Sequence, residues 1–79
     1  MEEKIIRNID ELVRALEEGY TNFYTKGFIN HSFHITFGVK EGIYEVYDLA
    51  DNLIVWMDAQ EVLEWFEDDF NEGTFIAED

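Results

Sequence analysis

The sequence predicts one α+β domain, in which an N-terminal helix, a three- to four-stranded antiparallel β-meander and a C-terminal acidic helix follow one another along residues 1–79. Apolar residues recur at helical spacing near both ends and with period two between them. The chain has no proline and no Gly/Ser linker that would mark a domain boundary. A chain this short buries only about 60% of its unfolded surface, so its core depends on bulky side chains, and 16% of the residues are aromatic.

The first helix is predicted to begin after Asn8, which forms an N-terminal capping pair with Glu11. Its apolar residues follow at i, i+3, i+4 and i+7: Ile9, Leu12, Val13 and Leu16. Gly19 suits the left-handed conformation that ends a helix. Ile5 and Ile6 either extend the helix upstream or form a short leading strand, and the pattern does not decide between the two.

Four strands are predicted in the middle of the chain, over residues 20–28, 31–39, 43–49 and 53–57. Short turns separate the last three, and Gly42 in the first of these turns suits a positive φ. In the second strand Phe33, Ile35 and Phe37 alternate with polar or small residues, so we expect all three to face the core.

The second helix is predicted to begin after Asp58, which repeats the capping pattern with Glu61, and to end at Gly73. One face carries the apolar residues Val62, Leu63, Phe66 and Phe70. The tail over residues 74–77 is short and is a candidate to dock on the sheet. The expected core is Leu12, Leu16, Phe33, Ile35, Phe37, Val62 and Phe66.

Charge is distributed unevenly along the chain. The net charge of −14 divides into −1 for residues 1–40, with five bases and six acids, and −13 for residues 41–79, with thirteen acids and no base. Binding to nucleic acid or to an anionic membrane needs clustered cations, so this balance argues against both.

No enzyme motif is found, and we expect neither a cofactor nor a metal. The chain has no cysteine, and His31 and His34 lie three apart, which places them on opposite faces of a strand. The acids around Asp48, Asp51 and Asp58 lack the calcium-loop spacing. A small acid–base enzyme is kept as a third function class, because carboxylates are abundant.

A cytoplasmic, soluble protein is expected. The first seven residues lack the basic and apolar regions of a signal peptide, and no apolar run approaches the roughly 20 residues that span a membrane. The lack of cysteine fits a reducing compartment.

The second helix carries the strongest functional signal. At 100° per residue four acids form a stripe nearly opposite its apolar face, and we call Glu61, Glu64, Asp68 and Glu72 the acidic stripe. Aromatic residues are candidate anchors for a partner. The candidate partner-binding residues are Glu61, Glu64, Trp65, Asp68, Asp69, Glu72, Tyr44 and Tyr47. The alternative for the two tyrosines is that they pack in the core or on the face of the sheet. The alternative for the acids is that they form a surface that serves only solubility.

The segment from Asn8 to Arg14, running into Tyr20 and Thr21, resembles the first helix and first strand of a phage-encoded anti-CRISPR inhibitor of Cas9. Size, acidity and element order are also similar to small phage inhibitors that mimic nucleic acid. The resemblance covers about the first quarter of the chain. It implies an inhibitor that occupies a nucleic-acid-binding site and assigns no individual residue a role.

We therefore expect a domain that binds a basic protein surface, belonging to a nucleic-acid-binding enzyme or regulator, and blocks it. Electrostatic steering would speed association, and aromatic contacts would add specificity. The alternative is an adaptor or interaction module whose acidity serves solubility, and which uses an exposed sheet face or edge to form a homodimer.

Overall fold

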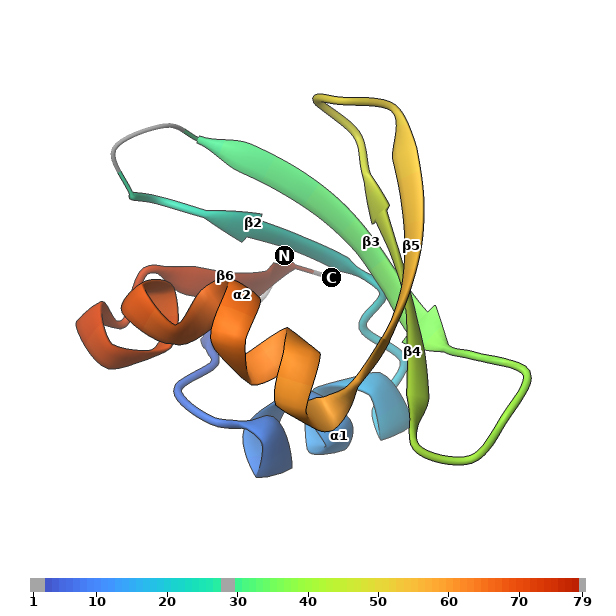
Figure 1. Ribbon diagram of the computed structural model, residues 1–79. Helices are drawn as coiled ribbons and strands as arrows, with labels where there is room; N and C mark the ends of the chain where they lie inside the picture. Colours follow the sequence, from blue (N-terminus) through green and yellow to red (C-terminus); the bar gives the residue numbers. More distant parts are fainter. Residues whose placement is uncertain (1–2, 28–29, 79) are drawn as a thin grey trace.

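The computed structural model describes residues 3–27 and 30–78 of the chain (Figure 1). In this part of the chain, the elements follow in the order β1 (Glu3–Ile5), α1 (Ile9–Glu17), β2 (Asn22–Thr25), β3 (His31–Phe37), β4 (Ile43–Asp48), β5 (Leu53–Asp58), α2 (Ala59–Glu72) and β6 (Phe75–Glu78). The α+β class and the meander of β2 to β5 are confirmed. The expected total of three or four strands is wrong, because the described residues form a six-stranded antiparallel sheet in the order β1-β6-β2-β3-β4-β5.

The two additional strands come from the ends of the described chain. β6 lies between β1 and β2, with Glu78 paired to both Glu3 and Asn22. Phe75, Ile76 and Ala77 are all buried, as is common for a short, continuous apolar strand in the interior of a sheet. The segment around Ile5 is a strand, and the pairing continues where Ile6 N–H donates to Phe75 C=O at 2.8 Å.

Both helices begin and end at the residues that the sequence indicated. The Asn8 side chain accepts the Glu11 N–H at 2.9 Å, and Asp58 forms a complete capping box with Glu61. Gly73 ends α2 in the left-handed conformation with φ 70°, and Gly19 follows α1 with φ 104°. These ends depend on residues within four positions of one another, which is why the sequence identified them.

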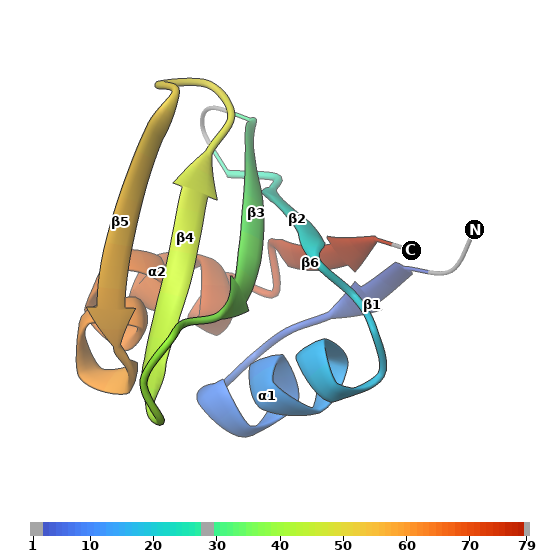
Figure 2. The ribbon, with the colours of Figure 1, turned by 90° about the vertical axis from the view of Figure 1, so that its right-hand side faces the viewer.

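The helices lie on one side of the sheet, and Figure 2 shows β3, β4 and β5 in front of α2 from the opposite side. Side chains from both helices and from all six strands except β1 meet between these layers. The buried set includes Leu12, Leu16, Phe23, Phe33, Ile35, Val46, Met57, Val62, Phe66, Phe70 and Phe75. No helix in the described residues has the length and apolar character needed to cross a membrane.

Phe37 is the exception among the expected core residues, because 51% of it is exposed. It follows Ile35 at the strand period, but it is the last residue of β3. The Tyr44 ring packs beside it, with centroids 6.1 Å apart. Alternation predicts the face on which a side chain lies, whereas burial also requires a helix above it.

Candidate functional site

The acidic stripe lies on the side of α2 that points away from the sheet, and all four of its residues are exposed. Its orientation follows from the opposite face, where Val62, Phe66 and Phe70 are buried. The Phe66 ring packs against Phe75 and Phe33, with centroids 4.7 and 5.0 Å apart. Interlocking aromatic contacts of this kind oppose rotation of the helix, so the stripe has a rigid support.

Two residues of the stripe also make local bonds. The Glu61 carboxylate accepts the Asp58 N–H at 3.4 Å as part of the capping box. The Gln60 amide donates to Glu64 at 3.2 Å. Neither bond neutralises a carboxylate, so the charge of the stripe remains.

The surroundings of the stripe are poor in positive charge. The described residues contain two ion pairs, Lys4–Glu18 and Lys26–Glu3, and neither involves α2. Residues 41–72, which contain no base, fold as the adjacent elements β4, β5 and α2. Arg7 lies near the C-terminal end of α2, where its guanidinium would stand about 3 Å from a Cβ added to Gly73. The helix dipole favours a cation at that end.

Trp65 borders the stripe, and 50% of it is exposed. Its ring contacts Phe66 and Phe33, with centroids 5.9 and 6.5 Å away. Asp69 is half-buried and accepts the Thr74 hydroxyl at 2.8 Å, so it stabilises the end of α2 and is not part of the exposed stripe. An aromatic ring supported by core contacts and half-open to solvent is typical of a binding anchor.

The two candidate tyrosines do not join this surface. Tyr44 is only 5% exposed, and burial, with a smaller contribution from Asp10, raises the pKa of its hydroxyl. Its assignment to a partner surface is therefore wrong, and its ring belongs to the core. Tyr47 is half-buried on the opposite face of the sheet, where its hydroxyl donates to Asn52. Strand alternation and the position of α2 separate it from the stripe.

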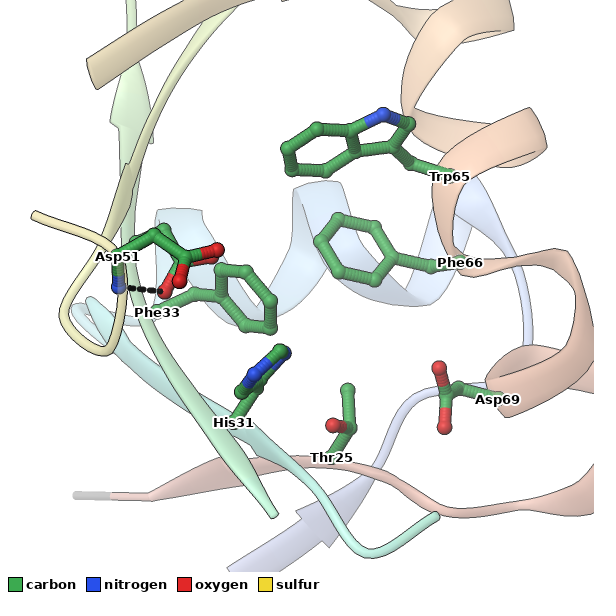
Figure 3. Close-up of a pocket in the computed structure, with 8 residues that line it drawn as sticks. Thr25, His31, Phe33, Asp51, Trp65, Phe66 and Asp69 are labelled. Atoms are coloured by element: carbon green, nitrogen blue, oxygen red, sulfur yellow. Dashed lines mark hydrogen bonds between the residues drawn. The ribbon is translucent and has the colours of Figure 1, made fainter. Parts of the chain in front are cut away.

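A cavity of about 300 Å³ lies beside Trp65, between α2 and the sheet (Figure 3). We call it the Trp65 pocket, and its lining residues are Thr25, His31, Phe33, Asp48, Asp51, Trp65, Phe66 and Asp69. In Figure 3 Asp51 and Asp69 stand on opposite sides of it, with the Phe33 and Phe66 rings between them. The pocket combines an aromatic floor with three carboxylates.

Local hydrogen bonds orient two of these carboxylates. Asp48 is buried and accepts the N–H groups of Ala50 at 2.9 Å and Asp51 at 3.2 Å. Asp69 is held by Thr74, as described above. Nowhere in residues 3–27 and 30–78 do three His, Cys, Asp or Glu side chains gather closely enough to hold a metal ion.

Sequence reasoning missed the pocket because its residues come from β2, β3, the end of β4 with the turn that follows it, and α2. In the sequence, Asp48 and Asp51 resemble calcium ligands only in residue type, and His31 is only a histidine within a predicted strand. No spacing links them to Trp65 along the chain. Their association is a product of tertiary structure.

The uncovered face of the sheet is a second exposed region. Ile54 is half exposed and Trp56 is 62% exposed, and the Trp56 indole N–H donates to Glu45 at 3.0 Å. β5 is also an edge strand of the sheet. Exposed apolar side chains on an edge strand are typical of protein contact surfaces.

No protein-family model, curated protein or solved structure matches this chain.

Proposed function

We propose that this protein binds a basic surface on a partner protein and blocks it, in the manner of a DNA-mimic inhibitor, and that it is not an enzyme. The observation that carries the proposal is the acidic stripe, four exposed carboxylates on a helix whose opposite face is locked in the core. No ion pair in the described residues neutralises them.

The stripe repeats its charges at a spacing comparable with that of nucleic acid. Successive acids rise by about 4.5–6 Å along the helix axis, which is of the same order as the roughly 3.4 Å axial phosphate step of one DNA strand but does not match it. A rigid helix loses little conformational freedom on binding, and a single-sign surface attracts a basic cleft over a distance. The resemblance to anti-CRISPR inhibitors favours a CRISPR nuclease as the first partner to test.

A second candidate function rests on the uncovered sheet face. An adaptor would use Ile54 and Trp56 to contact a partner or a second copy, and the acids would serve solubility. The net charge of −14 opposes association of two copies, which favours the blocking function over a homodimer.

The test compares two charge reversals of equal size. Glu64→Lys with Asp68→Lys changes the stripe, and Glu17→Lys with Glu41→Lys changes two exposed acids elsewhere. Binding to guide-RNA-loaded Cas9, and then to other nucleic-acid-binding enzymes, is measured by surface plasmon resonance. The stripe reversal is expected to slow association much more than the control, because steering depends on charge near the contact.

Competition and salt provide the second measurement. Target DNA should displace the protein from the enzyme, and affinity should fall steeply between about 50 and 200 mM salt. Trp65→Ala should act mainly by faster dissociation if the ring is an anchor. Equal binding by both reversal variants, together with indifference to DNA, would favour the adaptor.

A further inference from the structure

We infer that the Trp65 pocket binds the guanidinium group of an arginine side chain. The inference deepens the proposed function and rests on it for the source of that arginine, a basic partner surface. The chemistry of the pocket can be tested without the partner.

The size of the pocket limits what it holds. Its volume of about 300 Å³ is at the lower end of the roughly 300–1,000 Å³ typical of small-molecule sites. One long side chain fits such a space. The position next to the acidic stripe places this side chain within the same contact surface.

The aromatic lining favours a flat cation. Trp65 is half exposed and packs on Phe33 and Phe66, so its ring stays in place at the pocket. His31 stands edge-on to Phe33, with planes at 88° and centroids 6.0 Å apart. Guanidinium stacks on aromatic faces and is more weakly hydrated than ammonium, so arginine enters such a site at lower desolvation cost than lysine.

The acceptors are placed for a cation with several donors. Asp48 is fixed by two backbone N–H groups and Asp69 by the Thr74 hydroxyl, while Asp51 is exposed. The described acids around the pocket do not converge on a point as metal ligands do. Guanidinium carries five N–H donors spread over a plane, which matches acceptors on different sides of a cavity.

The experiment titrates ¹⁵N-labelled protein with Nα-acetyl-L-arginine amide and follows the indole N–H signals by NMR. The two tryptophans provide an internal control, because Trp56 is exposed and alternates with the buried Met57, so it lies on the opposite face of the sheet. We expect a saturable shift of the Trp65 signal and no saturable shift of Trp56. The uncharged citrulline analogue should cause no shift, and the lysine analogue a weaker one.

Variants then locate the binding site. Asp51→Asn should weaken binding of the arginine amide about two- to fivefold, in the range of a single exposed charge contact, and Asp51→Lys should weaken it further. Both keep the fold, because Asp51 is exposed in a turn. Glu41→Gln, an exposed acid outside both the stripe and the pocket, should leave the affinity unchanged.

Different experimental results would contradict the assignment of the pocket and the proposed function. Equal shifts of both tryptophans, equal binding of the citrulline analogue, or unchanged affinity in Asp51→Lys would overturn the pocket assignment, even if the stripe still binds a partner. Specific arginine binding together with partner binding that ignores the stripe reversal would overturn the proposed function alone.

Discussion

Phe66 and Phe37 are both phenylalanines, but they differ in burial. Phe66 is buried between α2 and the sheet, whereas Phe37 is half exposed at the end of β3. Phe66→Ala is expected to cost about 3–5 kcal/mol of unfolding free energy, a large part of the stability of a domain this size. Phe37→Ala should cost less than about 1.5 kcal/mol, because half of its ring is already hydrated. Urea denaturation measures both, and similar losses would contradict the structure.

Gly73 combines a backbone and a packing constraint. Its φ of 70° is unfavourable for other residues, and an added Cβ would stand 2.9 Å from the Arg7 guanidinium. Gly73→Ala should destabilise the protein by about 1–2 kcal/mol. Asn71→Ala, at an exposed position of the same helix, should stay within about 0.5 kcal/mol of the parent in the same denaturation experiment.

Tyr44 links burial to alkaline stability. Burial raises the pKa of its hydroxyl above the ordinary 10.0, so the folded state holds this proton more tightly than the unfolded state. The free energy of unfolding therefore falls as the pH rises above about 10, where the unfolded state releases this proton more readily than the folded state. Tyr44→Phe should show a smaller loss between pH 9 and pH 11, because the titrating group is gone. Parallel urea midpoints across this range would contradict this account.

At the scale of elements, β6 joins the ends of the described chain. Removing residues 74–79 would leave β1 and β2 without their shared partner and would delete the buried Phe75 and Ala77. We expect the shortened chain to lose dispersed amide signals in NMR. Ala77→Asp should destabilise strongly by burying a charge, whereas Glu78→Gln, half-buried at the end of β6, should retain the fold. A folded shortened chain would contradict the central position of β6.

At the scale of the whole molecule, like charges oppose folding. Residues 41–72 contribute only negative charge to β4, β5 and α2. The melting temperature is expected to rise between about 20 and 200 mM NaCl, because salt screens repulsion between exposed charges. The Glu64→Lys, Asp68→Lys variant should melt higher than the parent at low salt, and the difference should narrow as salt is added. A melting temperature that falls steadily with salt would count against a repulsive surface.

The sequence by itself determined the α+β class, both helices with their caps, the four-stranded meander and the acidic stripe. Each of these depends on residues a few positions apart, and local periodicity and backbone preference report such relations directly. Six of the seven expected core residues are buried for the same reason.

Only the tertiary structure decided the features that join distant parts of the chain. Glu3 pairs with Glu78, Phe37 lies beyond the cover of the helices, and Tyr47 faces away from α2. The Trp65 pocket collects side chains from four segments. The apolar tail 75–77 shows no strand alternation, because residues on both of its faces are buried. Its place between β1 and β2 therefore cannot be predicted from the sequence pattern, since that place depends on which strand edges the rest of the sheet leaves unpaired.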